Sequence, residues 1–167
     1  MKKLTALSLL LLSSVASANV STNEPTTFLD DVQVRLGGWS YHLSGDGYCP
    51  DLADKCKTSV FKEYNETNNA IGVRYKNWEV MTLENSFYER SFVAGYHFTY
   101  TPSKEIDYDL FLGLATGYTE VYDLGILPAI QPSVTYWATD NLGAELGLLM
   151  GSDIWVPVVT MSFKARF

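Results

Sequence analysis

The alternation of apolar and polar residues at the C-terminal end, "VVTMSFKARF", constrains the fold more than any other feature of this chain. From Val159 to Phe167 every second residue is apolar, and the residues between them are Thr, Ser, Lys and Arg. A period of two is the pattern of a β-strand with one apolar and one polar face. As the edge of an open sandwich, such a strand would leave backbone groups unpaired and prone to aggregate. We therefore expect it to belong to a closed sheet.

Similar alternating segments recur along the chain between turn signals. The expected strands span residues 32–43, 70–77, 78–87, 91–101, 109–121, 127–139, 142–150 and 155–167. After the N-terminal segment no stretch of 18 residues is apolar throughout, so no transmembrane helix is expected. Because lipid cannot satisfy backbone N–H and C=O groups, strands in a membrane must close into a barrel. The predicted fold is all-β, an eight-stranded antiparallel transmembrane β-barrel of the outer-membrane type.

The connections between these strands have the lengths that such a barrel requires. Short turns are expected at Asn77, at residues 101–104 and at Asp140–Asn141. Residues 44–69 are expected to form a long extracellular first loop. Short periplasmic turns that alternate with longer outer loops are typical of outer-membrane barrels. Residues 19–167 are therefore predicted to form a single barrel domain.

The two faces of the expected strands differ in polarity. In residues 142–150 the outward side chains are apolar, whereas Gly143, Glu145 and Gly147 point inward. The charged residues assigned to the interior are Arg35, Arg74, Lys76, Glu84, Glu145, Lys164 and Arg166. Charges at membrane depth are costly unless paired, so a salt-bridged core is expected in the lower barrel. Eight strands leave room for side chains or one slim ligand, which argues against a porin.

The first 18 residues have the pattern of a secretory signal peptide. Lys2 and Lys3 precede a short apolar run, and Ala16-Ser17-Ala18 is a small-residue cleavage site. Cleavage is therefore expected after Ala18. Loss of two lysines and no acid would change the formal net charge from −7 to −9. A surface this acidic argues against nucleic acid as a partner.

The last residue, Phe167, also indicates a location. A terminal alternating strand that ends in Phe resembles the signal that the barrel-assembly machinery of bacteria reads in outer-membrane proteins. The expected location is therefore the bacterial outer membrane, with phospholipid and lipid A as the surrounding lipids. We expect a monomer, and nothing in the sequence calls for a cofactor.

Both cysteines of the chain, Cys49 and Cys56, fall in the long first loop. In an exported protein two cysteines so placed are expected to form a disulfide, which would restrain the loop. A calcium site is the alternative, with Asp46, Asp51 and Asp54 as oxygen ligands. The spacing of these residues matches no known calcium loop.

The residues most suited to chemistry are His42 and Ser86, which are predicted at the same outer rim of the barrel. A bulge at Gly37–Gly38 would reverse the alternation and turn Ser40 and His42 inward. On the third strand Thr82, Glu84 and Ser86 are assigned to the inward face. A histidine base and a serine hydroxyl that converge in this way are the minimum for activated-hydroxyl chemistry. The alternative is that both are solvated rim residues.

The chain resembles the lipid A palmitoyltransferase family (PagP). The resemblance is carried by "GGWSYHL", "ENSF", "FVAGYHF" and "LPAIQPSVTYWATDNLGAELGLLMG", and it covers most of residues 35–167. It implies an outer-membrane barrel that moves a palmitoyl chain from a phospholipid to lipid A without a cofactor. It also implies that His42 and Ser86 are the reactive pair. Pro128 and Pro132 match the prolines at the family's lateral lipid entrance on the sixth strand.

The sequence departs from the family at two site positions. The family's Asp is Asn85 here, and an amide cannot hold the negative charge that stabilises an imidazolium. The family's Gly at the floor of the acyl pocket corresponds to His97, whose ring would shorten the pocket. Two functions therefore remain open. One is a catalytically silent barrel with a structural role or with extracellular loops that bind a partner. The other is an acyltransferase that uses His42 and Ser86, oriented by Asn85.

Overall fold

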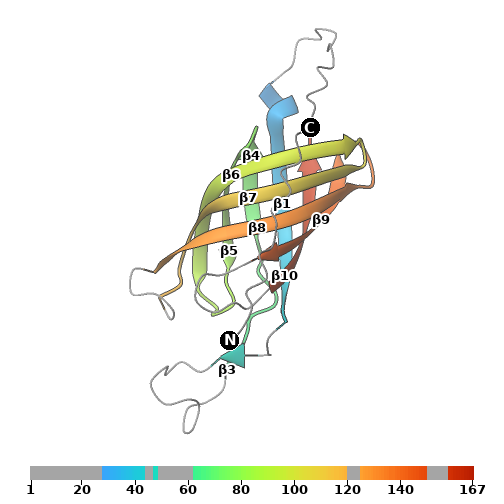
Figure 1. The fold of residues 1–167 in the computed structure, drawn as a ribbon. Helices are drawn as coiled ribbons and strands as arrows, with labels where there is room; N and C mark the ends of the chain where they lie inside the picture. Colours follow the sequence, from blue (N-terminus) through green and yellow to red (C-terminus); the bar gives the residue numbers. More distant parts are fainter. Residues whose placement is uncertain (1–27, 44–46, 49–61, 120–124, 150–157) are drawn as a thin grey trace, which may run out of the picture.

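The computed structural model describes residues 28–43, 47–48, 62–119, 125–149 and 158–167. Within these residues, eight strands form a closed antiparallel barrel in which each strand pairs with its neighbours along the chain (Figure 1). The strands are β1 (Val32–His42), β4 (Ile71–Tyr75), β5 (Trp78–Glu84), β6 (Arg90–Ser103), β7 (Ile106–Thr116), β8 (Ile126–Trp137), β9 (Leu142–Leu149) and β10 (Val158–Arg166). Pairing of β10 with β1 closes the barrel. The predicted fold class is confirmed.

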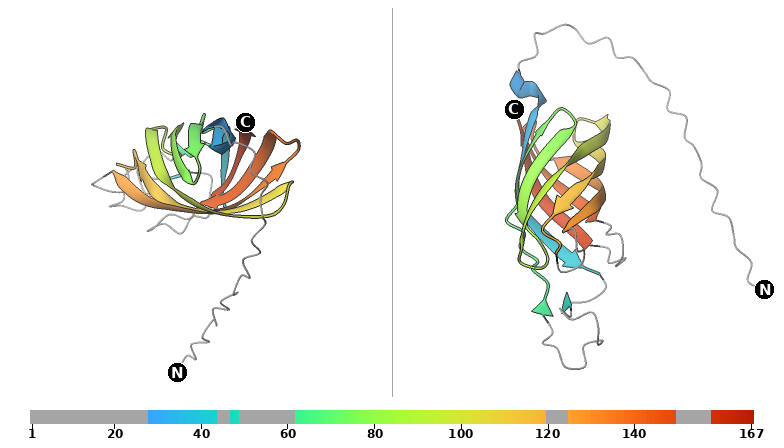
Figure 2. Two further views of the ribbon diagram at one scale, coloured as in Figure 1. Left: turned by 90° about the horizontal axis from the view of Figure 1, so that it is seen from above. Right: turned by 90° about the vertical axis from the view of Figure 1, so that its left-hand side faces the viewer.

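The two ends of the barrel are built differently. The turns that join β4 to β5, β6 to β7 and β8 to β9 lie at the same end as the C-terminus and the short 3-10 helix η1 (Phe28–Asp31) (Figure 1). A small separate sheet of β2 (Gly47–Tyr48) and β3 (Lys62–Glu63) lies beyond the opposite end. Figure 2 shows the tilt of the strands across the barrel wall. Within the described residues, no helix is long and apolar enough to span a membrane.

The outer surface of the barrel is apolar over most strands. The large exposed side chains on it include Leu36, Val73, Val80, Phe92, Phe98, Leu110, Leu112, Leu114, Ile130, Leu146, Met161 and Phe163. Tyrosine and tryptophan stand near strand ends, among them Trp39, Tyr41, Tyr75, Trp78, Tyr100, Tyr108 and Tyr136. An apolar band with aromatic residues at its borders is the surface that a membrane-spanning barrel presents to lipid.

A bulge in β1 reverses the inward and outward faces of that strand. The register between β1 and β10 shifts between Leu36 and Trp39, and Gly37 adopts a left-handed φ of 74°. Beyond the bulge Trp39 and Tyr41 are exposed, whereas Ser40 and His42 are buried. The predicted bulge and its effect on these side chains are both confirmed. A residue with a Cβ would be strained at Gly37, so glycine is what makes this reversal possible.

The inward face of β5 is the opposite of the one predicted. Glu79, Met81, Leu83 and Asn85 point into the barrel, and Thr82 does not. The ladder with β6 fixes this choice, because it places Glu79 opposite the inward Gly95 and Met81 opposite the inward Val93. The sequence is ambiguous here because each face of the strand carries one glutamate. The assignment of Thr82 and Glu84 to the interior was therefore wrong.

A buried ionic layer fills the lower barrel, which is the half nearer the turns and the C-terminus and is drawn uppermost in Figure 1. Arg35 binds Glu79 and Glu145, Lys164 binds Glu145 at 2.5 Å, and Arg74 binds Asp109 at 3.1 Å. His97 connects the two halves, with Nε2 2.5 Å from Glu79 and Nδ1 3.4 Å from Asp109. Of the charges predicted to be inside, Arg35, Arg74, Glu145 and Lys164 belong to this layer.

Three predicted interior charges, Lys76, Glu84 and Arg166, lie outside that layer, and two of its members, Glu79 and Asp109, were not predicted. Lys76 is exposed; its Nζ lies 3.9 Å from Asp31 and 5.5 Å from the ring centroid of Tyr75. The guanidinium of Arg166 covers the ring of Trp137 at 4.1 Å from the centroid. Glu79 was assigned to the wrong face, and Asp109 was taken only as the start of a strand. Charges at this depth are stable only as a mutually bonded group, and this layer has that character.

Candidate functional site

His42 and Ser86 lie within hydrogen-bonding distance at the rim of the barrel. The distance between His42 Nε2 and Ser86 Oγ is 2.9 Å. His42 is the last residue of β1, and Ser86 follows the last residue of β5 by two positions. The two predicted residues therefore meet in space although they are far apart in sequence. The geometry suits transfer of a proton from the serine hydroxyl to the imidazole.

The segment before β4 holds β1 and β5 together at this rim. β4 begins only at Ile71, and residues 65–68 fill the wall above it. Ser40 N donates to Glu66 O and Asn68 N donates to Gly38 O, both at 2.8 Å. On the other side, Glu84 N donates to Asn68 O at 2.7 Å and Asn65 N donates to Ser86 O at 2.9 Å. This segment therefore sets the spacing between the two strands that carry His42 and Ser86.

Asn85 builds the turn that carries Ser86. Its Oδ1 accepts hydrogen bonds from Phe87 N at 2.9 Å and Glu89 N at 3.0 Å. Its Nδ2 donates to Ser91 Oγ at 3.1 Å and to Gly117 O at 2.5 Å. The side chain is 1% exposed, and no hydrogen bond joins it to His42 within the described residues. Asn85 was expected to orient the imidazole. Its hydrogen bonds instead hold the chain around Ser86.

His42 itself is buried against an aromatic ring. Its imidazole stacks on the ring of Tyr64, with centroids 4.0 Å apart and planes inclined by 13°. The edge of Phe87 contacts Tyr64, and Phe87 in turn meets Tyr118, both at 6.0 Å between centroids. His42 is 6% exposed, and its Nδ1 has no hydrogen-bond partner in the described part of the chain. Among the described residues, therefore, no carboxylate bonds the far side of the imidazole in this pair.

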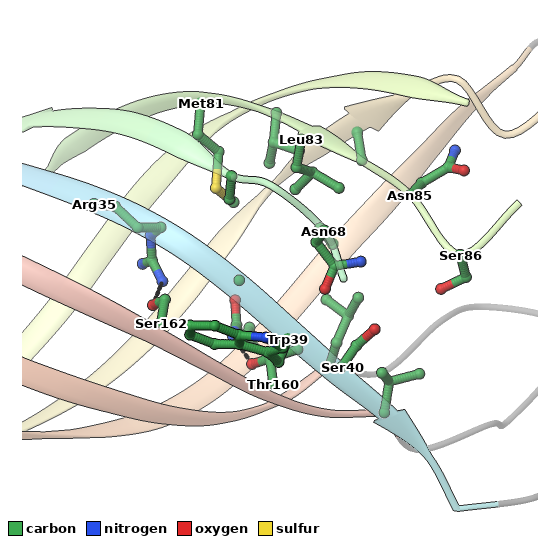
Figure 3. Close-up of a pocket in the computed structure, with 18 of the residues that line it drawn as sticks. Arg35, Trp39, Ser40, Asn68, Met81, Leu83, Asn85, Ser86, Thr160 and Ser162 are labelled. Atoms are coloured by element: carbon green, nitrogen blue, oxygen red, sulfur yellow. Dashed lines mark hydrogen bonds between the residues drawn. The ribbon is translucent and has the colours of Figure 1, made fainter. Parts of the chain in front are cut away.

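A pocket leads from Ser86 down into the barrel. It encloses about 730 Å³, counting the part that is open to solvent. Its walls are mostly apolar and include Met81, Leu83, Val93, Phe111, Ala115, Tyr118, Ala129 and Leu149. Figure 3 shows Ser86 at one end and Arg35, bonded to Ser162, at the other. An apolar tube with a polar mouth suits a hydrocarbon chain whose reactive group stays at the rim.

One predicted pocket residue lies elsewhere, and a phenylalanine ring lines the wall in a way that was not predicted. His97 was expected at the floor, but it does not line the pocket and lies deeper, in the ionic layer. The phenyl ring of Phe111 covers Gly95 and Gly113, where a Cβ atom would come within 2.5 Å of the ring. These two glycines form a recess in the wall, so the bulky ring leaves the pocket open beside it.

The ladder between β8 and β9 starts at the turn that joins these strands and stops before it reaches the rim that carries His42 and Ser86. Paired residues run only from Trp137–Gly143 to Ser133–Gly147, whereas β8 pairs with β7 as far as Ile126. Pro132 is the next residue of β8, and Pro128 follows four positions further up. Proline brings no N–H to a ladder. The upper part of β8 thus lacks strand pairing on its β9 side within the described residues.

Comparisons with known proteins agree with this architecture. A designed protein whose solved structure is described as "De novo design of transmembrane beta-barrels" superposes with a TM-score of 0.57 over 82% of this chain and 96% of that chain. The fold is that of a transmembrane β-barrel. At 13% identity the likeness concerns the fold alone. No protein-family model matches the sequence, and no curated protein matches it.

Some features expected from the sequence lie outside the described residues. Conversely, some residues of the site were not predicted from the sequence. The signal peptide and Cys49 and Cys56 lie outside the described residues, as do the three aspartates of the alternative calcium site. Among the described residues, no group of three or more His, Cys, Asp or Glu side chains is arranged to hold a metal ion. Tyr64 was not predicted, because it lies between the expected strands and belongs to no motif. Tyr118 was assigned to the outward face of the strand expected at residues 109–121, which was wrong: β7 ends at Thr116, and Tyr118 lines the pocket.

Proposed function

We propose that this protein is an acyltransferase of the bacterial outer membrane that moves an acyl chain from a phospholipid to lipid A. The observation that carries the proposal is the 2.9 Å contact between His42 Nε2 and Ser86 Oγ at the mouth of an apolar pocket. A reactive hydroxyl that opens onto an apolar pocket suits an ester of a long-chain acid. The resemblance of "GGWSYHL" and "ENSF" to the lipid A palmitoyltransferase family points to the same chemistry.

The proposed reaction proceeds in two transfers. His42 Nε2 takes the proton of Ser86 Oγ while that oxygen attacks the ester carbonyl of the phospholipid. The bond from Oγ to the acyl carbon forms, the ester bond breaks, and the proton passes to the departing lysophospholipid oxygen. A hydroxyl of lipid A then gives its proton to His42 Nε2 as its oxygen attacks the acyl-serine; the bond between the acyl carbon and Oγ breaks, and His42 passes that proton to Ser86 Oγ. Atoms balance without a cofactor.

Access for the acyl chain is proposed through the upper wall between β8 and β9. There the ladder ends at Ser133–Gly147, and Pro132 supplies no N–H beyond it. A phospholipid tail in the surrounding membrane would enter the pocket sideways while its headgroup stays at the rim. The polar floor formed by Arg35 and Ser162 limits how deep the chain can go.

A catalytically silent barrel is the second candidate, and one observation favours it. His42 Nδ1 has no hydrogen-bond partner within the described residues. Asn85 stands where the family has Asp, and its side chain is used in hydrogen bonds that shape the turn carrying Ser86. Without a carboxylate, the imidazolium formed during proton transfer is less stable. In that case the barrel would have a structural role, or its extracellular loops would bind a partner.

The deciding experiment is expression in cells that lack their own palmitoyltransferase, followed by mass spectrometry of lipid A. An added acyl chain that disappears in Ser86→Ala and His42→Ala and persists in Ser103→Ala supports the enzyme. Ser103 is the matched control because it lies at the opposite end of the barrel. Unchanged lipid A in the wild type under membrane stress supports the silent barrel.

We also propose that the chain is exported, cleaved after Ala18, oxidised at Cys49 and Cys56, and inserted as a monomer by the barrel-assembly machinery through its last strand. The intact mass of the purified protein tests the first two steps. It should lack residues 1–18, and it should rise by the mass of two hydrogens on reduction. Deletion of Phe167 should lower the amount recovered from outer membranes.

A further inference from the structure

The imidazole of His42 is bounded on two sides by specific contacts. Its Nε2 meets Ser86 Oγ, and its face lies on the ring of Tyr64 at 4.0 Å and 13°. Its remaining nitrogen, Nδ1, is buried without a hydrogen-bond partner in the described residues. The ring's direction toward Ser86 is therefore set by stacking rather than by a hydrogen bond on its far side.

A serine–histidine pair places two requirements on its surroundings. The imidazole must be oriented so that one nitrogen points at the hydroxyl, and the imidazolium that forms must be stabilised. A carboxylate on Nδ1 meets both requirements in the best-known pairs of this kind. In this barrel the side chain nearest in sequence to Ser86, that of Asn85, is bonded to Gly117 O and Ser91 Oγ instead.

We infer that Tyr64 is the positioning residue for His42 and fills both requirements through the face of its ring; this rests on the proposed acyl transfer. A nearly parallel stack fixes the plane of the imidazole, and the 2.9 Å contact with Ser86 Oγ selects the ring flip that points Nε2 at the hydroxyl. The electron-rich face of an aromatic ring also attracts a cation placed over it, and imidazolium is such a cation. Both effects are strongest where water is excluded, and His42 is buried.

Tyr64 is held in register with Ser86 by its neighbours. Asn65, the next residue, donates from its backbone N to Ser86 O at 2.9 Å and from Nδ2 to Asn85 O at 3.2 Å. The edge of Phe87 packs on the ring of Tyr64. These contacts connect the aromatic ring that stacks on His42 to the serine that faces it. Burial also raises the pKa of the Tyr64 hydroxyl, so the ring stays neutral.

The test compares Tyr64→Phe, which keeps the aromatic face, with Tyr64→Leu, which removes it. Acyl transfer is measured on the full chain in mixed micelles of phospholipid and lipid A. Tyr64→Phe should stay within about twofold of wild type, whereas Tyr64→Leu should lower kcat about tenfold with KM little changed. In protein labelled at its two histidines, the ring protons of His42 should lose their upfield ring-current shift only in Tyr64→Leu.

A second readout separates this inference from the proposed function. A fluorophosphonate labels an activated serine without any acyl acceptor, and mass spectrometry locates the label on Ser86. Slower labelling in Tyr64→Leu but not in Tyr64→Phe supports the inference even where lipid A is unchanged. Equal labelling or equal kcat in wild type and Tyr64→Leu would overturn it. Absence of labelling in the wild type would overturn it together with the reactive pair.

Discussion

Asn85 Nδ2 donates to the carbonyl oxygen of Gly117 at 2.5 Å, and this bond fastens the turn that carries Ser86 to the chain just beyond β7. The same amide group donates to Ser91 Oγ, and its oxygen accepts from two backbone N–H groups. An amide has both donors and an acceptor, which is what this position uses. Both ends of the Asn85 amide are therefore engaged in shaping the turn that carries Ser86.

Asn85→Asp should destabilise the barrel and should not increase acyl transfer. An ionised carboxylate has no donor for Gly117 O or Ser91 Oγ and would repel the carbonyl oxygen. Leaving such buried groups unsatisfied costs about 1–3 kcal/mol. Urea unfolding in detergent micelles measures the change, with the exposed Asn69→Asp as control. A gain of activity in Asn85→Asp would show that the amide is only a weakened carboxylate.

Gly117→Ala should disturb the same turn from the other side. Gly117 has a left-handed φ of 81°, and a Cβ atom there would lie 2.7 Å from Arg90 O. Strain of this kind costs about 1–3 kcal/mol. We expect a lower unfolding midpoint and slower fluorophosphonate labelling of Ser86. Labelling at the wild-type rate in a destabilised variant would mean that the turn does not control the serine.

Arg35→Leu should be severely destabilising, because it leaves Glu79 and Glu145 buried without their shared cation. Removal of one partner from such a group costs about 3–5 kcal/mol. Lys76→Ala is the matched control, since Lys76 is exposed and its pair is worth at most about 1 kcal/mol. In the double variant Arg35→Leu/Glu79→Leu the loss should be smaller than the sum of the two single losses. Additive losses would mean that the layer is not a cooperative unit.

Ala115→Phe should block the pocket without inactivating Ser86. Ala115 lies in the apolar wall, and a phenyl group there would occupy the space proposed for the acyl chain. Overpacking of this kind costs about 1–3 kcal/mol. Ala94→Phe is the control because Ala94 faces outward. Mass spectrometry of lipid A should show loss of the added chain in Ala115→Phe only, while Ser86 is still labelled by the fluorophosphonate.

The bulge in β1 could be predicted from sequence because two adjacent glycines and a change in the apolar pattern both point to it. Trp39 and Tyr41 on one side and Ser40 and His42 on the other leave a single consistent assignment. The inward face of β5 could not be predicted in the same way. Glu79 and Glu84 stand on opposite faces, so polarity alone does not choose, and the register with β6 decides.

That His42 and Ser86 lie at the same rim followed from strand order, but the inward direction of Ser86 was predicted from an alternation with Thr82 and Glu84 that the structure does not have. The surroundings of the pair could not be predicted. Two strands that ascend to the same rim bring their last residues to one level, and this requires only a count of strands. Tyr64 reaches His42 through a segment without regular pairing, whose path depends on individual hydrogen bonds such as that from Asn65 N to Ser86 O. Such paths leave no periodic trace in a sequence.

The ionic layer below the pocket also decides from which side of the membrane this protein can act. Because Arg35, Glu79, His97 and Asp109 close the lumen beneath the apolar tube, a molecule that enters at the rim has no exit at the other end. The lumen is therefore closed at one end and does not form a channel through the barrel. In the proposed acyl transfer, the acyl chain must therefore enter and leave at the end where β1 and β5 terminate.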